Sequence, residues 1–424
     1  MTDEIAYLRV DELIAQYRAK ARSPVDVIDD ALARIVRFDR ALNAFQLVDA
    51  EAARSQAKAS EKRWRAGEPL SDLDGIPVSI KELFLTRGWP TPKGSKTTDQ
   101  RQTWDEDAPA VARLREAGAV VFGKTTSPEF GWKGITDGPL NGTTTSPWNT
   151  EYSPGGSSGG AAAALAAGIG PLALGTDGGG SIRIPAGYTG LFGIKPTFGR
   201  VPHHPAENPF DTLVSSGPLA RNVSDAARML NVLSRPDARD WYAAPYDSAD
   251  YLAGLDQGIE GLRIAYSPNL GGARPEREVT DITDRAVKLL QDLGANIEDV
   301  GQVFDPLRPI FEDYWVAGFG HILRGIPRDK HDLLDPGFRI LAVRGLNVGL
   351  EDYFKGLSAR ATLGARMAAF HETYDLLVTP TVPTTAPRAD TVYHSTDFDR
   401  WDHAVPYTVP FNLTGQPASS VPVG

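Results

Sequence analysis

Two short loops of glycine and serine contain the densest group of potentially reactive side chains in the chain, at residues 155–160 and 178–181. Glycine is favoured where the backbone takes a positive φ or must let another group approach closely. The segment between the loops begins with alanines, which favour a helix, and the first loop would therefore present free N–H groups at a helix N-terminus. This combination of N–H donors and hydroxyls predicts an active site rather than a role in packing alone.

One interpretation of this stretch is that it carries a serine nucleophile activated by a group other than histidine. Three other interpretations compete with it. A phosphate-binding loop needs a lysine after the glycines, and none follows either cluster. The pattern GGSSG at 155–159 matches a nucleophile elbow, but an elbow needs a strand directly before it, and residues 150–154 have no strand character. A pair of flexible turns is the non-functional alternative.

Residues 75–82 change to the alternating pattern of a strand. Val78 and Ile80 alternate with Ser79 and Lys81, so a strand would place Lys81 on the face opposite the two aliphatic residues. From the residues alone, a solvated charge on an edge strand is the favoured interpretation of this lysine. A helix at 107–118 and a strand at 119–122 follow, and this alternation indicates a layered α/β fold. Further along the chain, a capped helix is predicted at 224–233 and another helix at 359–373.

Several motifs in these segments resemble the signature of the amidase signature family of serine hydrolases. They are GIPVSIKE at 75–82, SPGGSSGG at 153–160, GTDGGGSIRIP at 175–185 and GIKPT at 193–197. The similarity runs in order from about residue 73 to residue 197 and resumes at TPTVP (379–383) and PFNLTGQP (410–417). Ordered motifs at sensible distances are far more specific than a single glycine pattern.

The resemblance implies a Ser-Ser-Lys triad. It makes Ser181 the nucleophile, Ser157 the hydroxyl that relays protons, and Lys81 the base, and it implies a cis peptide bond between Gly156 and Ser157. Lysine has an ordinary pKa near 10.4 and is protonated at neutral pH. The base role therefore requires burial, which disfavours the charged form and lowers the pKa.

The resemblance also implies a substrate-binding set. Backbone N–H groups beside Ser181 would stabilise the oxyanion, contributed by Gly178, Gly179 and Gly180. Asp177 and Arg183 are expected to brace this loop rather than to react.

Long ordered loops often line binding sites, and the polar and aromatic stretch at 125–149 is such a loop. The resemblance implies that it borders the acyl pocket. Gly131 and Trp132 are its candidate substrate contacts. The alternative, that the aromatic side chains only anchor the loop, stays open.

Composition excludes several classes of function. The 424 residues carry a formal net charge of −10, which disfavours nucleic acid and anionic membranes as partners, and the absence of cysteine excludes thiolate chemistry. His203 and His204 lie near Glu207, but adjacent histidines on a strand point to opposite faces, so no metal site is predicted. No cofactor is expected. The acidic start of the chain has no apolar signal region, which predicts a cytoplasmic protein.

We therefore predict a single α/β domain over 1–424, an α/β/α sandwich with a mixed central sheet flanked by helices. It comprises an N-terminal helical region at 1–70, a catalytic signature core at 73–200 and a variable cap over the site at 300–358. Family members continue beyond the last motif into a further strand and a terminal helix. We therefore expect either a truncated sequence at Gly424 or a different closure of the sheet.

The predicted function is hydrolysis of a small carboxylic amide to an acid and ammonia or an amine, through an acyl-serine intermediate. One alternative is a glutamine-hydrolysing amidotransferase A-type subunit, which Ile184 disfavours because such subunits usually carry a polar glutamine at this position. Another is a non-catalytic binding protein that keeps the fold, although such a protein has no need of a complete triad. The expected partner is the small-molecule amide alone. The oligomeric state is left open, with a homodimer as one expectation.

Overall fold

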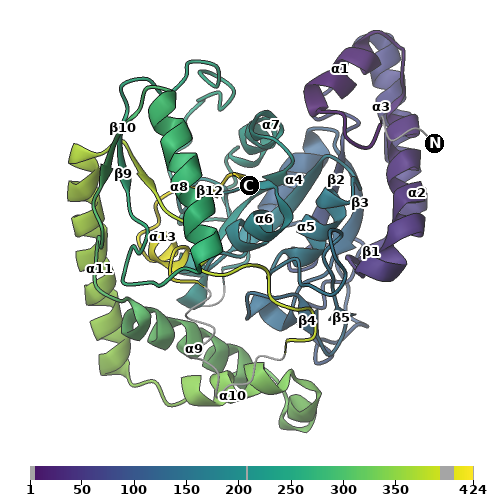
Figure 1. Cartoon of the computed structure of the whole chain (residues 1–424). Coiled ribbons are helices and arrows are strands. Elements are labelled where there is room, and N and C mark those ends of the chain that lie inside the picture. Colours follow the sequence, from purple (N-terminus) through teal and green to yellow (C-terminus); the bar gives the residue numbers. More distant parts are fainter. Residues whose placement is uncertain (1–4, 207–208, 392–404, 424) are drawn as a thin grey trace.

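A mixed seven-stranded sheet forms the centre of the computed structural model, which describes residues 5–206, 209–391 and 405–423 (Figure 1). The strands of this sheet are β1 (Phe45–Val48), β2 (Pro77–Lys81), β3 (Val120–Thr125), β6 (Leu172–Asp177), β7 (Phe192–Lys195), β8 (Ser215–Ala220) and β12 (Ala418–Ser420). Their order is β1-β3-β2-β6-β8-β7-β12. β2 is parallel to β3 and β6, and the other neighbours pair antiparallel.

The N-terminal region is helical, as predicted, with one exception. It contains α1 (Val10–Arg18), α2 (Pro24–Leu42) and α3 (Ala50–Ala66), drawn in purple in Figure 1. α2 begins where it does because the Ser23 hydroxyl accepts a hydrogen bond from the Val25 amide and Pro24 occupies the first turn. The exception is β1, which joins the edge of the central sheet and was not predicted.

Helices cover both faces of the sheet, so the predicted sandwich is confirmed. α4 (Pro109–Glu116) and α7 (Val223–Leu233) pack with α1 on one face, against an apolar cluster that includes Val78 and Ile80. α2 and α5 (Gly159–Ala166) pack on the other face with α6 (Arg183–Thr189). β2 lies inside the sheet, between β3 and β6, and all its residues are buried. The interpretation of Lys81 as a solvated edge charge is therefore wrong.

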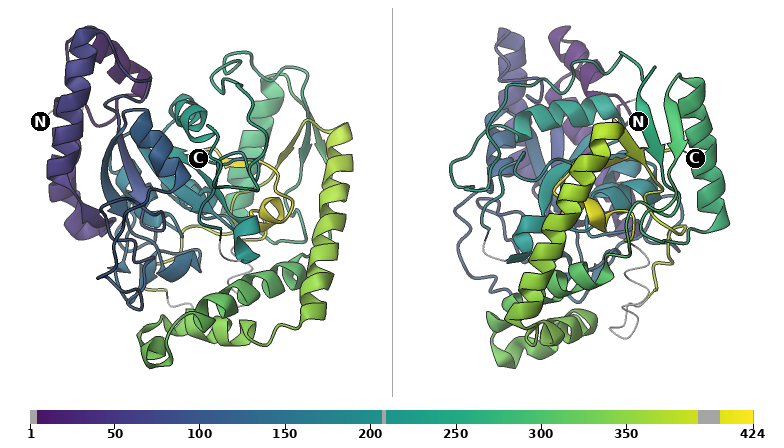
Figure 2. Two further views of the ribbon diagram at one scale, coloured as in Figure 1. Left: turned by 180° about the vertical axis from the view of Figure 1, so that it is seen from behind. Right: turned by 90° about the vertical axis from the view of Figure 1, so that its left-hand side faces the viewer.

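A second, three-stranded sheet lies beside the first and is parallel throughout. Its order is β10 (Asn296–Asp299), β9 (Arg263–Tyr266) and β11 (Leu376–Val378). It is accompanied by α8 (Arg277–Asp292) and by the long helix α11 (Leu350–Thr373), which is seen along its length in both views of Figure 2. The sequence predicted this helix only from residue 359, so its first two turns were missed.

The segment predicted to cap the site is helical. It contains α9 (Arg308–Arg324), the short η3 (Arg328–Leu333), α10 (Pro336–Gly345) and the start of α11. α9 and α10 pack through a cluster of aromatic side chains that includes Trp315, Phe319 and Phe338. The remaining short elements are η1 (Glu129–Gly131), β4 (Asp137–Gly138), β5 (Gly142–Thr143), η2 (Pro209–Leu213) and α13 (Val409–Leu413).

Within the described ranges, no helix combines the length and the apolar character needed to cross a bilayer.

Candidate active site

Lys81 contacts two hydroxyl groups in the interior of the protein. Its Nζ lies 2.7 Å from Ser157 Oγ and 2.9 Å from Thr176 Oγ1. Lys81 is the last residue of β2 and Thr176 the penultimate residue of β6. Because the two strands are parallel neighbours, their carboxyl ends meet at the same edge of the sheet. The topology therefore brings the amine and both hydroxyls together.

The environment of Lys81 favours the neutral amine. The side chain is 0% exposed. Burial lowers the pKa of Lys81 to about 7, although the carboxylates of Asp177 and Glu82 oppose this shift. A large share of the protein therefore carries an unprotonated amine at neutral pH, which meets the physical requirement for a base.

Ser157 belongs to a loop in which glycine is required by close contact. The peptide bond between Gly156 and Ser157 is cis, as the resemblance implied. A Cβ on Gly156 would lie 2.6 Å from the Ile135 carbonyl, so no larger residue fits there without a shift of the backbone. The next amide, that of Ser158, donates a hydrogen bond of 3.1 Å to the carbonyl of Ser181. The two glycine–serine loops are thus joined directly.

Asp177 organises the loop that carries Ser181. Its carboxylate accepts hydrogen bonds from the amides of Gly180 (2.8 Å) and Ile182 (3.2 Å) and pairs with the Arg183 guanidinium at 2.9 Å. Burial by itself would raise the pKa of Asp177, but Arg183 and Asn412 hold it well below its ordinary range. The predicted bracing role of Asp177 and Arg183 matches this geometry.

Asn412 and Thr408 complete the support of this loop from the C-terminal part of the chain. The Asn412 amide donates to the Asp177 carbonyl at 2.9 Å and its oxygen accepts from Arg183 at 2.7 Å. Thr408 Oγ1 donates to the Gly179 carbonyl at 2.6 Å. The motif at 410–417 was noted from the sequence, but these two roles were not predicted.

The three glycines predicted to form the oxyanion hole are not equivalent. Gly178 lines the cavity described below. The amide of Gly180 already donates to Asp177, so it is not free to face an oxyanion. The carbonyl of Gly179 is engaged by Thr408. A role for these amides in oxyanion binding stays a prediction.

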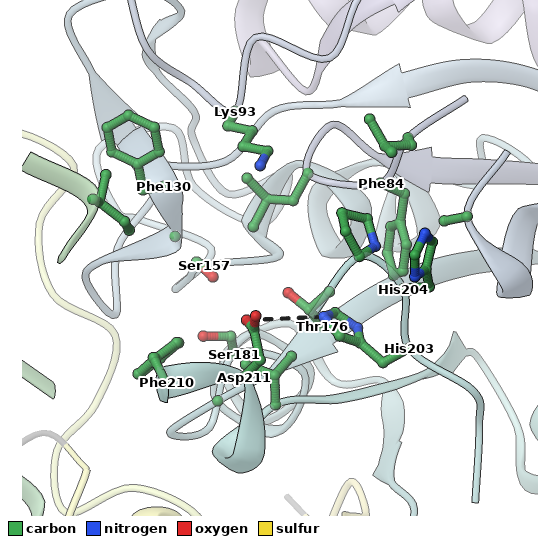
Figure 3. A pocket seen from close by; sticks show the side chains of 18 of the residues that line it. Phe84, Lys93, Phe130, Ser157, Thr176, Ser181, His203, His204, Phe210 and Asp211 are labelled. Atoms are coloured by element: carbon green, nitrogen blue, oxygen red, sulfur yellow. Dashed lines mark ion pairs between the residues drawn. The ribbon is translucent and has the colours of Figure 1, made fainter. Parts of the chain in front are cut away.

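Ser157, Thr176 and Ser181 line one cavity of about 330 Å³ (Figure 3). Gly131 also lines it, and a Cβ there would lie 3.2 Å from Ser157 Oγ. Trp132 does not: it is 2% exposed and packs in the apolar cluster that includes Trp315. The other walls are mainly apolar and come from Leu83, Phe84, Leu85, Phe130, Phe210, Val214, Trp315 and Ile322.

The sequence matches the protein-family model for amidases over residues 26–424. The chain belongs to the amidase signature family. It is 36% identical to the A-type subunit of a glutamyl-tRNA(Gln) amidotransferase from Acidothermus cellulolyticus, over 97% of this chain and 87% of that one. It is 33% identical to an acylamidase from Rhodococcus erythropolis, over 100% and 90% of the two chains.

Solved structures agree with this assignment. A bacterial aryl acylamidase of the amidase signature family superposes with a TM-score of 0.90 at 28% identity. The superposition covers 99% of this chain and 90% of the acylamidase chain. A peptide amidase bound to the inhibitor chymostatin superposes with a TM-score of 0.84 at 28% identity, over 99% and 91% of the two chains. The amidase fold is therefore shown, and the family hydrolyses C–N amide bonds, but these relatives differ in substrate.

The cavity of this amidase also contains polar residues that sequence reasoning did not assign to the site. Residues 203–205 form no strand, and His203 and His204 both line the cavity, so the expectation that they point to opposite faces is wrong. His203 Nε2 lies 3.9 Å from Asp211 Oδ1, the pair marked by the dashed line in Figure 3. Burial lowers the pKa of His203, against the effect of Asp211 and Asp240. No pattern in the sequence connected this loop with the glycine motifs.

Among the described residues, no group of three or more His, Asp or Glu side chains is placed to hold a metal ion.

Proposed function

We propose that this amidase hydrolyses a carboxylic amide to the acid and ammonia or an amine, through an acyl intermediate on Ser181. The observation that carries the proposal is the 2.7 Å contact between the buried amine of Lys81 and Ser157 Oγ, in a cavity that Ser181 also lines. A buried amine with a lowered pKa can accept a proton near pH 7, which an ordinary lysine cannot.

Acylation proceeds by proton relay. Ser181 Oγ attacks the amide carbon while its proton passes to Ser157 Oγ, and the Ser157 proton passes to the neutral Lys81 amine. The resulting tetrahedral oxyanion is stabilised by backbone N–H groups of the glycine loop. The C–N bond then breaks as the proton returns from Lys81 through Ser157 to the leaving nitrogen. Acyl-Ser181 and free amine are the products of this half-reaction.

Deacylation repeats the relay with water as the nucleophile. Lys81, neutral again, accepts a proton from water through Ser157, and the hydroxide attacks the ester of Ser181. Collapse of the second tetrahedral intermediate breaks the bond to Ser181 Oγ, which recovers its proton. The carboxylic acid leaves, and no group other than water is consumed.

The cavity favours amides that carry an aromatic or bulky apolar group. About 330 Å³ is large for an acetyl or formyl group alone, and the aromatic side chains of Phe84, Phe130, Phe210 and Trp315 line it. The similarity to an aryl acylamidase supports this substrate class.

An amidotransferase component that releases ammonia from glutamine is the second candidate. It is favoured by the 36% identity to the A-type subunit of a glutamyl-tRNA(Gln) amidotransferase. Ile184, which follows the nucleophile loop, disfavours it because those proteins usually carry a polar residue there. Release of ammonia from glutamine at a rate that exceeds hydrolysis of aryl amides would make this second function the correct one.

Release of 4-nitroaniline from butyryl-4-nitroanilide tests the proposal. Ser181→Ala is expected to lower kcat/KM by about 10⁴ or more while the far-UV circular dichroism is unchanged. Ser216→Ala is the matched control, because Ser216 is a buried serine on β8, does not line the cavity and has no side-chain hydrogen bond to any described residue. Undiminished hydrolysis by Ser181→Ala would refute the assignment of the nucleophile.

A further inference from the structure

Lys93 is the one lysine or arginine among the described residues that line the cavity. In Figure 3 its side chain extends into the cavity between Phe130 and Phe84. Its ammonium group forms neither a hydrogen bond nor an ion pair with any described residue. A positive charge therefore faces a largely apolar space and has no partner within the part of the chain that the structure describes.

The backbone holds this lysine in an uncommon conformation. Lys93 has φ 56° and Phe130 has φ 51°, both in the left-handed region that residues other than glycine rarely adopt. The two residues are connected, since the Phe130 amide donates to the Lys93 carbonyl at 2.7 Å. Both side chains line the cavity. Such conformations persist only where the surroundings impose them, and they concentrate at functional sites.

The contacts of the residue after Lys93 help to impose this conformation. The next residue, Gly94, packs so closely that a Cβ would lie 3.0 Å from the backbone of Glu129. The Gly94 amide donates to Glu82 Oε2 at 3.1 Å, and Glu82 directly follows Lys81, the last residue of β2. The loop that carries Lys93 is thus fixed to the residue next to the proposed base.

The acidic groups behind this loop are already used by other donors. Glu82 also accepts hydrogen bonds from the Ser127 amide at 2.8 Å and from the Asn141 side chain at 2.6 Å. Glu129 accepts from Ser95 Oγ at 2.6 Å and from the Asp335 amide at 2.6 Å. Neither carboxyl group forms an ion pair with Lys93, so its charge remains available to a ligand.

We infer that Lys93 is a specificity-determining residue that binds an anionic group, such as a carboxylate, which the amide substrate carries away from its scissile bond. A hydrogen bond between two ionised groups is stronger than a neutral one, and it gains strength where apolar walls exclude water. The apolar walls then hold the body of the substrate, and Lys93 fixes one charged end. This inference rests on the proposed amide hydrolysis, and it narrows the substrate class to charged amides.

Binding to the Ser181→Ala protein, measured by calorimetry, tests the inference without requiring turnover. Three ligands are compared: neutral butyryl-4-nitroanilide, succinyl-4-nitroanilide with a carboxylate on the acyl side, and the butyryl amide of 5-amino-2-nitrobenzoate with a carboxylate on the amine side. One of the two charged amides is expected to bind about tenfold or more tightly than the neutral amide. Which of them does so identifies the side of the scissile bond that faces Lys93.

Variants at position 93 assign the preference to the lysine. Lys93→Met is expected to abolish the preference while the affinity for the neutral amide stays within about threefold, and Lys93→Arg is expected to retain it. Lys96→Met is the matched control, because Lys96 is an exposed lysine three residues further along that does not line the cavity. Equal binding of all three amides, or a preference that survives Lys93→Met, would overturn the inference.

Failure of the proposed function gives a different result. If the parent protein releases neither 4-nitroaniline nor 5-amino-2-nitrobenzoate from the three amides, amide hydrolysis of this class is refuted, whatever the calorimetry shows. If the neutral amide is hydrolysed but the Ser181→Ala protein binds all three ligands alike, or its preference survives Lys93→Met, only the inference about Lys93 fails.

Discussion

Replacement of Lys81 by arginine tests whether this residue acts as a base or only as a fixed positive charge. Arginine keeps the charge but does not lose its proton in a protein, so it cannot accept the proton of Ser157. Lys81→Met removes both the charge and the base while keeping a similar length. If Lys81 is the base, kcat/KM of both variants is expected to fall by a factor of about 10²–10⁴. A structural ion pair or an oxyanion clamp predicts instead that arginine restores activity.

The size of the accompanying pH effect follows from the environment of Lys81. Burial lowers the pKa of Lys81 to about 7, and the neutral amine is the form that accepts protons. About a tenth of the protein is then competent at pH 6, about half at pH 7 and about nine tenths at pH 8. Because the active form exists above the pKa, kcat/KM is expected to rise about tenfold from pH 6 to pH 8 and then to level off.

The assay is release of 4-nitroaniline, measured from pH 5.5 to pH 9 at constant ionic strength. His203 also lies in the cavity, so His203→Gln is the control that assigns the acidic limb, and it is expected to keep that limb. A flat profile between pH 6 and pH 8, or substantial activity of Lys81→Arg, would refute the base role of Lys81.

Three further predictions concern stability and the other cavity residues. Burial lowers the pKa of Lys124 to about 7, below its unfolded value of about 10.4, so the unfolded chain binds more protons between these values. Urea unfolding should show a free energy of unfolding that rises with pH from 7 to 9, and Lys124→Met should reduce that slope by about 1.4 kcal/mol per pH unit. Arg183→Leu leaves the buried Asp177 carboxylate unpaired and should lower the free energy of unfolding by about 3–5 kcal/mol. Because the proposed relay needs no imidazole, kcat/KM should stay within about tenfold of the parent when alanine replaces any one of His203, His204 and His321.

Each of these predictions has a defined contrary result. A slope that Lys124→Met leaves unchanged would show that this lysine is not neutral in the folded protein. For Arg183 the control is Arg101→Leu, which breaks an exposed pair with Asp99 and should leave the free energy of unfolding nearly unchanged. Equal losses in the two arginine variants would contradict the bracing role. Loss of all activity in one folded histidine variant would favour a histidine-based triad.

The sequence predicted much of the fold because its elements carry local signals. The alternation at 75–82 gave the strand β2, and the capped apolar pattern at 224–233 gave α7 nearly to the residue. The start of α11 was missed, since residues 350–358 mix Gly356 with aromatic and charged side chains and carry no clear period. β1 was missed for a similar reason, because four residues between two strong helices are too short to show a pattern.

Site residues were predicted only where they lie in the family motifs or in the stretch at 125–149. The alternation around Lys81 cannot distinguish an edge strand from a central one, because that difference depends on β3 and β6, which lie elsewhere in the sequence. The contacts of Asn412 with Asp177 and Arg183 join residues more than 200 positions apart, so no periodic pattern in the sequence reveals them. Likewise, nothing local shows that Lys93 faces the same cavity as Ser181. These features follow from how distant segments pack.

Transfer of the acyl group to Ser181 can be tested directly by trapping the acylated protein. Reaction with butyryl-4-nitrophenyl ester, in which acylation is fast, can be quenched in acid within the first turnover and digested for peptide mapping by mass spectrometry. We expect one butyryl group per chain, located on Ser181 and absent from the Ser181→Ala and Lys81→Met proteins. A butyryl group on Ser157, or a full turnover with no acylated peptide, would contradict it.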